Sequence, residues 1–456
     1  MKGHVPTPDD LADHIVQKLF RDPPEAGDTI LYPGCGKAPF VAAVERWCND
    51  NNAPTPEGTA IELDPEHLSV ARERHADRLV TFAERDFLAD VDDLDEFDYI
   101  VGNPPYVPIE GLDEQEKQRY KSRFDTAIER FDLYILFFEQ SLNLLAEDGR
   151  LSFITPEKFE YVSTGSELRT LLASYHIEEI EHVAEDAFGE LLTYPAITTI
   201  EHTTPAPGET TICLRDGTER TVTLPGNGDS WASTIRGGVP EMDTGVTLGD
   251  ITTRVSCGVA TGADSLFVQD EDEVPPQLIE NEWTYPTTSG RQLLQNDGPD
   301  SGQLMICPYD ERGNLASEDE IGVYGDWAEI NRERLEDRSC VEKGKAWYSM
   351  HENPPMEDIL RPKILTKDVT EEPMFWSDDS GEIVPRHSVY YIIPDDNTEL
   401  NDLLEYLNSE QARTWIEANA QKAHNDYYRI QSKVLKNLPV PQELGESHQA
   451  TLPGLD

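Results

Sequence analysis

The chain reads Phe97-Asp98-Tyr99-Ile100-Val101-Gly102-Asn103-Pro104-Pro105-Tyr106 at the end of its first hundred residues. The first five side chains are mostly aromatic or β-branched, a composition typical of a buried strand. The two prolines end that strand, because proline cannot donate a hydrogen bond to a sheet ladder. In open α/β sheets, ligands bind beyond the carboxyl ends of the strands. We therefore expect Asn103 and the rigid turn after it to lie where a ligand binds.

Strand-like runs and helical patterns alternate on both sides of this stretch. Strands are predicted over residues 29–32, 59–63 and 97–101, with helices beginning at residues 40 and 64. Further along, the pattern predicts a helix over 132–145, a strand over 151–154, a helix over 166–175, and strands over 177–183 and 196–201 that can close the sheet as a hairpin. This alternation predicts an α/β fold with a Rossmann-like, doubly wound sheet.

A first helix is expected at Thr7-Pro8-Asp9-Asp10. Thr7 is predicted to be the N-cap, Pro8 the first helical residue and Asp10 the carboxylate at the third position. Leu11 and Ile15 then lie on one helical face.

The alternation ends in a segment rich in proline, threonine and glycine, residues 203–210. We therefore expect a catalytic domain over 1–205, an irregular α+β domain over 206–441 and a tail over 442–456. The second domain mixes short β-like pieces with one clear helix over 399–419. Two domains suit a chain of 456 residues.

Composition narrows the class of protein. The six cysteines are scattered singly, without the CxxC spacing of a zinc site, so we expect no metal and a reducing cytoplasm. No apolar run approaches the length of a membrane helix, so we expect a soluble protein without a membrane partner.

The charge is strongly acidic, with 89 Asp and Glu residues against 37 Lys and Arg residues and a formal net charge of -52. At low ionic strength such a chain repels both itself and DNA. At molar salt the Debye length falls to about 3 Å, and most of that repulsion is screened. The composition predicts adaptation to the high-salt cytoplasm of a halophile; the alternative is a merely acidic protein. Acidity therefore does not exclude DNA as a partner.

Three segments near predicted strand ends carry groups suited to a nucleoside. The turn at residues 32–36, Tyr-Pro-Gly-Cys-Gly, lets a ligand approach the backbone, although a tight turn also requires glycine. Asp64 is expected to cap the next helix, which leaves Glu62 free to accept hydrogen bonds from two ribose hydroxyls. Asp86 suits an adenine amino group and Phe87 the ring, although a polar loop start explains them equally. The chain has no GKS or GKT for a triphosphate.

The segment Asn103-Pro104-Pro105-Tyr106 suits the activation of an aromatic amine. The side-chain carbonyl of Asn103 and the backbone carbonyl of Pro104 can accept the two amine protons, which favours a pyramidal nitrogen. Pro105 stiffens the turn, and Tyr106 offers a face on which a base can stack. The alternative is a proline turn that only caps a buried strand.

With these motifs in this order, the sequence resembles the gamma-class adenine-N6 DNA methyltransferases of restriction-modification systems. Thr7-Pro8 matches the family's leading motif, residues 32–40 its glycine motif, and Asn103 to Tyr106 its catalytic loop. The resemblance implies S-adenosylmethionine as cofactor, held by Thr7, Tyr32, Gly34, Gly36, Glu62, Asp86 and Phe87. The family usually has an acid in place of Tyr32, so this contact departs from its pattern.

The resemblance also extends to DNA binding. It implies that Phe188 stacks on the flipped base, with a plain core role as the alternative, and that the second domain recognises the target site. Basic residues interleaved with aromatic ones suit phosphate contacts and base stacking, and a solvated face is the alternative. They form two groups: Lys343, Lys345, Arg361, Lys363 and Lys367, and then Lys422, Arg429, Lys433 and Lys436 beside Tyr427 and Tyr428.

The resemblance implies a monomeric enzyme that methylates the N6 amino group of a flipped adenine in double-stranded DNA, as part of a restriction-modification or phage-defence system. Two alternatives stay open: methylation of cytosine N4, which needs the same acceptors, and a catalytically weak DNA-binding specificity subunit. Asparagine rather than serine at position 103 favours adenine. No lysine has an acid two residues before it, so the D/E-x-K nuclease core is absent. A cognate restriction endonuclease is expected to be a separate polypeptide.

Overall fold

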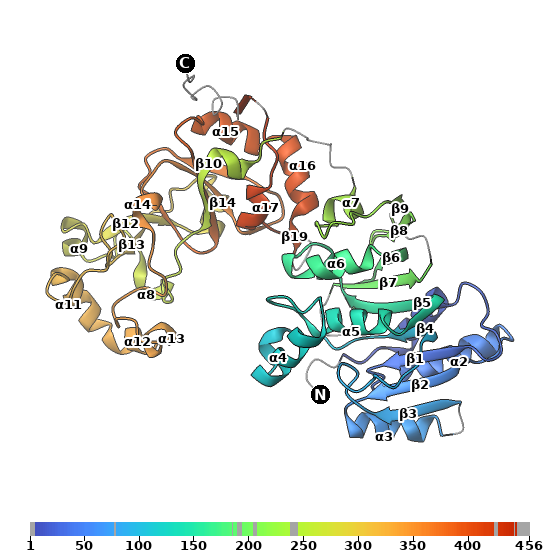
Figure 1. Cartoon of the computed structure of the whole chain (residues 1–456). Coiled ribbons are helices and arrows are strands. Elements are labelled where there is room, and N and C mark those ends of the chain that lie inside the picture. The colour runs from blue at the N-terminus through green and yellow to red at the C-terminus, as the bar shows by residue number, and fades with distance from the viewer. Residues whose placement is uncertain are drawn as a thin grey trace, which may run out of the picture. The chain divides into compact units, whose positions relative to one another are not determined.

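The computed structural model describes residues 5–76, 79–184, 186–188, 194–203, 208–237, 245–423, 427–441 and 443–444. The chain divides into two compact units, Met1–Gly237 and Gly238–Asp456 (Figure 1). The expected boundary at residue 205 precedes this division by about thirty residues. Of the expected tail, only residues 443–444 are among those described.

The first unit is built on a nine-stranded sheet with the order β3-β2-β1-β4-β5-β7-β6-β8-β9. Its strands are β1 (Thr29–Pro33), β2 (Glu57–Glu62), β3 (Val80–Glu84), β4 (Phe97–Gly102), β5 (Leu145–Pro156), β6 (His176–His182), β7 (Pro195–Glu201), β8 (Thr210–Cys213) and β9 (Glu219–Val222). The first five strands pair in parallel, and β7 runs antiparallel to β5 and β6. The predicted α/β fold and the closing β6–β7 hairpin are confirmed.

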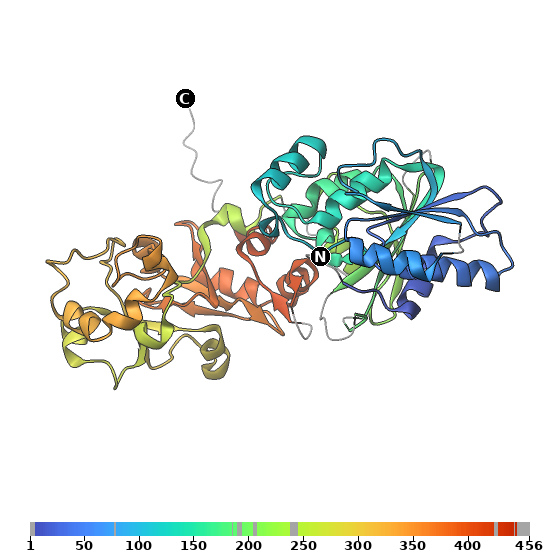
Figure 2. The ribbon, with the colours of Figure 1, turned by 90° about the horizontal axis from the view of Figure 1, so that it is seen from below.

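Helices cover both faces of this sheet, and Figure 2 shows the blue helices and the teal helices on opposite sides of the strands. One face carries α1 (Asp9–Leu19), α2 (Pro39–Asp50) and α3 (Pro65–Arg74). The other carries α4 (Glu114–Arg123), α5 (Leu133–Leu142), α6 (Ser166–Leu172), α7 (Ala232–Arg236) and the 3-10 turns η1 (Ile109–Gly111), η2 (Glu157–Glu160) and η3 (Ser163–Gly165). Every residue of α5 from Tyr134 to Leu142 is buried, which explains its lack of a polar face.

The first residues of α1 and α3 test two predicted N-caps. Asp64 caps α3 as predicted, because its Oδ1 accepts hydrogen bonds from the backbone N–H groups of Glu66 (2.9 Å) and His67 (3.2 Å). The prediction for Thr7 was wrong. Helix α1 begins at Asp9 with Pro8 as N-cap, and the Thr7 hydroxyl instead accepts a hydrogen bond from the Asn103 side chain at 3.1 Å.

Strands β8 and β9 explain why the first unit extends past residue 205. Sequence analysis assigned these short β-like pieces to the second domain. In the structure β8 pairs in parallel with β6, and β9 pairs with β8. Ile212 of β8 is fully buried in the core of the first unit. The segment predicted as the boundary, residues 203–210, therefore lies in the sequence between two strands of one sheet. Its residues 204–207 lie outside the described part of the chain.

The second unit is α+β and contains three smaller sheets, with the orders β10-β18-β14-β16, β11-β13-β12-β17 and β15-β20-β19. Its strands are β10 (Thr252–Cys257), β11 (Val268–Asp270), β12 (Thr284–Thr288), β13 (Gln303–Ile306), β14 (Lys363–Lys367), β15 (Val369–Thr370), β16 (Phe375–Asp378), β17 (Val384–Pro385), β18 (Val389–Pro394), β19 (Gln421–Lys422) and β20 (Tyr428–Arg429). Its helices are η4 (Leu248–Ile251), α8 (Asp264–Phe267), α9 (Pro276–Glu280), α10 (Gly290–Asn296), α11 (Gly322–Ile330), α12 (Arg332–Glu336), α13 (Ser339–Glu342), α14 (Met356–Ile359), α15 (Leu400–Leu407), α16 (Glu410–Asn419) and α17 (Ser432–Lys436). In the described part of the chain, no helix combines the length and apolar composition that crossing a membrane requires.

The sheet containing β14 and β18 separates two cores of the second unit. Ile364 and Ile392 pack with residues of α15, α16 and α17, whereas Leu365 and Tyr391 pack into the other core. Successive side chains of a strand point to opposite faces, so one sheet can serve both cores.

The single helix predicted over residues 399–419 is two helices, α15 and α16. Asn408 lies between them and exchanges two hydrogen bonds of 3.0 Å with the backbone of Phe375, one through each end of its amide. Ser409 then caps α16 by accepting from the Ala412 N–H at 3.1 Å. A contact with a distant strand therefore interrupts a pattern that is locally helical.

Lys363 is fully buried, and its expected role as a phosphate-contacting cation was wrong. Its Nζ pairs with Asp378 Oδ2 at 2.5 Å, and Asp378 also accepts from the backbone N–H groups of Gly381 and Ile383 at 3.0 Å. Burial lowers the pKa of the Lys363 ammonium, and the Asp378 carboxylate opposes that effect. The pair belongs to the interior of the second unit.

We expect Lys363→Met to lower the free energy of unfolding of the second unit by about 3 kcal/mol, because it leaves the Asp378 carboxylate buried without its cation. Denaturant titration followed by tryptophan fluorescence measures this loss. Lys343→Met, which removes an exposed lysine of the same unit, is the control and should change stability by at most about 0.5 kcal/mol. Equal unfolding midpoints for the two variants would contradict a structural role for Lys363.

Candidate active site

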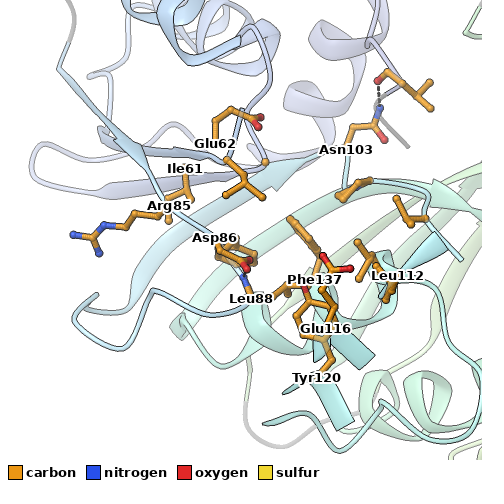
Figure 3. Close-up of a pocket in the computed structure, with 17 residues that line it drawn as sticks. Ile61, Glu62, Arg85, Asp86, Leu88, Asn103, Leu112, Glu116, Tyr120 and Phe137 are labelled. Atoms are coloured by element: carbon orange, nitrogen blue, oxygen red, sulfur yellow. Dashed lines mark hydrogen bonds between the residues drawn. The ribbon is translucent and has the colours of Figure 1, made fainter. Parts of the chain in front are cut away.

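Two adjoining cavities lie at the carboxyl ends of β1, β2 and β4. The larger has a volume of about 250 Å³ and the smaller about 180 Å³. Val5, Gly34 and Asn103 line both cavities, so the two are parts of one crevice. Figure 3 shows the larger cavity, with Glu62, Asp86 and Asn103 placed around it on successive strand ends.

The glycine turn after β1 borders both cavities, because Gly34 lines both of them and Gly36 lines the smaller one. Gly34 and Gly36 both have left-handed backbones, with φ of 61° and 56°. A Cβ added to Gly34 would lie 3.3 Å from the Phe137 ring, so a side chain there would crowd the larger cavity. Glycine at these positions leaves the backbone open to a ligand, and the predicted contact of the cofactor with this turn stays a prediction.

Glu62 ends β2 and is 2% exposed. Sequence analysis expected its carboxylate to be free for a ligand, but each oxygen already accepts one backbone hydrogen bond. Oε2 accepts from Gly36 N–H at 2.7 Å and Oε1 from Asp64 N–H at 2.8 Å. Because an ionised carboxylate offers about four acceptor positions, both oxygens keep capacity for a ligand. The two backbone bonds hold Glu62 in a fixed orientation at the cavity wall.

Asp86 and Phe87 follow β3 and line the larger cavity. Asp86 Oδ1 accepts from the Leu88 N–H at 3.0 Å, and Oδ2 pairs with Arg119 of α4 at 3.0 Å. The Phe87 ring packs against Phe137 of α5 with centroids 5.0 Å apart. A carboxylate beside two aromatic rings is an arrangement suited to a flat ring that carries an amino group.

Tyr32 is placed apart from the other predicted cofactor residues. It is 2% exposed, lies in the core formed with α1 and α2, and belongs to neither set of cavity-lining residues that the structure describes. Burial raises the pKa of its phenol well above the usual value, so the side chain stays neutral.

The smaller cavity contains charged residues that sequence analysis did not select, namely Asp9, Lys37 and Arg74. Thr7, which it did select, lines the same cavity. Lys37 lies inside the glycine motif, and Asp9 lies two residues after Thr7. Their closeness in sequence to predicted cofactor residues could have identified them. No neighbouring motif in the sequence indicates a cofactor contact for Arg74, which is the last residue of α3.

The two ends of the Asn103 amide differ in their hydrogen bonding. Its Nδ2 donates to the Val5 carbonyl at 3.0 Å, the dashed line at Asn103 in Figure 3, and to the Thr7 hydroxyl at 3.1 Å. Its Oδ1 is buried and has no hydrogen-bond partner among the described residues. An unpaired buried acceptor costs about 1–3 kcal/mol. The arrangement therefore suits a ligand that donates a hydrogen bond to this oxygen.

The rest of the Asn-Pro-Pro-Tyr turn carries an aromatic group. Pro104 is buried and Pro105 lines the larger cavity. The Tyr106 hydroxyl donates to the Ile154 carbonyl at 3.3 Å. Its ring meets Phe188 nearly at right angles, with centroids 6.4 Å apart. The structure thus brings Phe188 beside the turn, and its stacking role stays a prediction.

Two family models match separate parts of the chain. Residues 45–188 match the Eco57I restriction-modification methylase, and residues 312–440 match the TaqI-like C-terminal specificity domain. The first match contains the Glu62, Asp86 and Asn103 motifs and ends at Phe188. The resemblance to restriction-modification methyltransferases with a target-recognition domain is confirmed.

Three type II methyltransferases are similar over most of the chain. M.PaeR7I of Pseudomonas aeruginosa is 28% identical over 76% of this chain, M.BstVI of Geobacillus stearothermophilus 26% over 78%, and M.XhoI of Xanthomonas vasicola 25% over 76%. The alignments span 65%, 70% and 68% of those proteins, so this chain matches about two thirds of each.

A solved structure shares its fold with most of this chain. The type IIL restriction-modification enzyme MmeI, solved in complex with DNA, is similar over 94% of this chain and 64% of its own chain, with a TM-score of 0.62 and 13% identity. The first unit therefore has the fold of the S-adenosylmethionine-dependent methyltransferases, and the cofactor of this fold and family is S-adenosylmethionine.

We expect Glu62→Gln to weaken the binding of S-adenosylmethionine by at least about tenfold, because hydrogen bonds to a charged group contribute about 1.5–3 kcal/mol each. Isothermal titration calorimetry measures the affinity. Glu84→Gln is the matched control, since Glu84 ends the neighbouring strand β3 and is exposed. Unchanged affinity in both variants would show that Glu62 does not hold the cofactor.

Proposed function

We propose that this chain is a site-specific DNA methyltransferase that transfers a methyl group from S-adenosylmethionine to the N6 amino group of a flipped adenine in double-stranded DNA. The observation that carries the proposal is the Asn103 amide, whose buried Oδ1 has no partner in the described structure while its Nδ2 is held by Val5 and Thr7. A preorganised acceptor beside the cavity is what an exocyclic amine requires.

The chain's own residues position and activate the amine. Asn103 Oδ1 accepts one amine N–H, and the Pro104 carbonyl accepts the other. Both acceptors are fixed before the base arrives, so the nitrogen lone pair is directed without a strong base. The cofactor, when bound, supplies the methyl group. Tyr106 and Phe188 hold the extruded base by stacking, which offsets part of the few kcal/mol that extrusion costs.

The crevice accommodates the two ends of the cofactor differently. In our proposal Glu62 accepts from the ribose hydroxyls, Asp86 accepts from the adenine amino group, and Phe87 covers the ring. Gly34, Gly36 and Thr7 border the smaller cavity, which takes the methionine end. The charges of Asp9, Lys37 and Arg74 complement its ammonium and carboxylate groups. Tyr32 has no part in this proposal.

The two alternatives fare differently. Cytosine N4 presents the same amine to the same acceptors, so only the methylated product separates it from adenine. Adenine is favoured by the asparagine at position 103, as in the family that the sequence resembles. The alternative of a catalytically weak subunit depends on Tyr32, which stands where the family usually has an acid that contacts the cofactor. The charged residues of the smaller cavity can make such contacts in its place.

We assign target recognition to the second unit, in which the specificity-domain match lies. Two of its expected DNA-contacting lysines pack on tyrosine rings: Lys422 lies 4.2 Å from the Tyr428 ring centroid and Lys367 lies 6.0 Å from that of Tyr427. Such pairs present charge and a stacking face together. We propose a monomer that acts in a restriction-modification or phage-defence system.

The function is tested by methyl transfer from labelled cofactor to DNA, with nucleoside analysis of the product. Wild type should yield N6-methyladenine. We expect Asn103→Ala to lower kcat by about 10²–10³-fold or more, because it removes a preorganised acceptor, while cofactor affinity stays within about twofold.

Asn143→Ala is the matched control, because Asn143 is exposed just after α5 and lines neither cavity as described. It should retain wild-type turnover. Wild-type turnover by Asn103→Ala would refute the proposed activation, and N4-methylcytosine as the product would replace adenine with cytosine as the target.

We also propose that the protein works in a high-salt cytoplasm, on the strength of its net charge of -52. Folding and activity should therefore require salt near or above about 1 M, where the screening length is about 3 Å. Plasmid methylation across a potassium chloride series, with circular dichroism in parallel, separates unfolding from lost DNA binding.

The high-salt proposal also predicts how the protein binds DNA. Counterion release contributes little at such salt, so non-specific binding should be weak and recognition should rest on base contacts and stacking. Full folding with maximal activity near about 0.1 M salt, where the screening length is about 10 Å, would refute the high-salt proposal.

A further inference from the structure

Arg215 joins the two strand ends between which Phe188 lies in the chain. Phe188 follows β6 and precedes β7. The Arg215 side chain, just beyond β8, donates from Nε to the Val183 carbonyl at 2.7 Å and from Nη2 to the Pro195 carbonyl at 3.2 Å. The Val183 N–H also donates to the Pro195 carbonyl at 3.0 Å. One guanidinium therefore holds the end of β6 and the start of β7 together.

Glu157 ties the same guanidinium to the end of β5. Its carboxylate is 2% exposed and pairs with Arg215 Nη1 at 2.7 Å. Its backbone N–H donates to the Tyr194 carbonyl at 2.8 Å, and the Arg215 guanidinium lies 5.3 Å from the Tyr194 ring centroid. Arg215 thus contacts three segments, each of which borders the position of Phe188 or Tyr106.

A second buried pair completes the cluster. His182, the last residue of β6, contacts Glu160 at 2.9 Å and Glu157 at 3.7 Å. Burial acts to lower the pKa of His182, but the two carboxylates outweigh it, and the pKa is raised. Buried charges require such pairing. The strands already pair through their backbones, and the cluster adds side-chain contacts between their ends.

The cluster connects directly to the catalytic turn. Tyr106 donates its hydroxyl to Ile154 of β5, three residues before Glu157, and its ring meets Phe188. Any shift of the β6 and β7 ends relative to β5 therefore changes the distance between these two rings. Buried ion pairs often contribute little stability but specify geometry.

We propose that Arg215 and Glu157 form a clamp that fixes Phe188 beside Tyr106, and that both are positioning residues for the capture of the extruded base. The inference rests on the proposed function and deepens it. In the absence of the clamp, Phe188 is free to move away from Tyr106, and the extruded base loses stacking while the acceptors at Asn103 and Pro104 stay in place.

The same sheet offers a matched control away from the carboxyl end of β5. Arg150 of β5 is 6% exposed, donates to the Leu19 carbonyl at 2.8 Å, and pairs with Glu178 of β6. It is therefore a buried arginine that ties strands to a neighbouring segment, but it lies in the middle of β5, six residues before the carboxyl end of the strand. A variant that loses only stability should behave alike at both positions.

The experiment compares Arg215→Met, Arg215→Lys and Arg150→Met in the full chain. The substrate is a duplex with the site found by sequencing the wild-type methylation product. Arg215→Met should lower kcat/KM by at least about tenfold, equivalent to about 1.4 kcal/mol, with cofactor affinity unchanged. Arg215→Lys keeps the charge but not the fork, so its activity should be intermediate. Arg150→Met should keep wild-type kcat/KM.

A second duplex, with a mismatched base opposite the target adenine, tests whether base extrusion is the step that Arg215→Met impairs. A mismatched base costs less to extrude, so the Arg215→Met defect should shrink on this duplex. Equal losses in Arg215→Met and Arg150→Met, or a loss in Arg215→Met that the mismatch does not reduce, would overturn the clamp.

Hydrogen exchange separates this inference from the proposed function. The backbone amides of Val183 and Glu157 should exchange faster in Arg215→Met than in wild type or Arg150→Met. If wild type methylates no DNA, the proposed function fails, and exchange alone decides whether Arg215 holds these strand ends. Unchanged exchange in Arg215→Met would overturn the clamp in either case.

Discussion

In the proposed mechanism, the amide of Asn103 accepts a hydrogen bond from the reacting amine only while its nitrogen end is occupied. An asparagine amide presents a donor at one end and an acceptor at the other, and free rotation would exchange them. The Val5 carbonyl and the Thr7 hydroxyl bind Nδ2, which leaves Oδ1 as the end that faces a ligand. Residues almost a hundred positions apart must therefore meet. They meet because α1, which begins just after Thr7, packs on β4, β5 and β7 of the sheet.

The strand order explains why the other groups gather at the same place. The sheet runs β3-β2-β1-β4, so the chain reverses its direction of progress between β1 and β4. At such a switch point the connections leave on opposite faces and open a crevice. Gly34 follows β1 and Asn103 follows β4, and these two residues line both cavities. Glu62 and Asp86 come from the next strands outward.

Local rules predicted the features that depend on neighbours in sequence. The strand runs, the Asp64 cap and the Asn-Pro-Pro-Tyr turn each rest on a few adjacent residues. Predictions failed where a distant group competes. Thr7 was expected to cap a helix, but Asn103 takes its hydroxyl; the helix over 399–419 breaks because Asn408 binds Phe375; Lys363 pairs with Asp378. Tyr32 was ambiguous for another reason: β1 is buried on both faces, so alternation cannot tell which face meets the ligand.

The scarce cations show how an acidic chain divides its basic residues between folding and binding. Only 37 basic residues accompany 89 acidic ones, yet Arg150, Arg215 and Lys363 pair with carboxylates within the two units. The Lys363–Asp378 pair is buried and the two arginine pairs are partly buried, so all three are screened less than surface pairs. Surface cations lose most of their attraction for phosphate at high salt, whereas the stacking of rings does not depend on ionic strength in that way. In the proposed function, the aromatic residues beside the Asn103 turn and the groups that position them therefore matter more to DNA binding than the total positive charge of the chain.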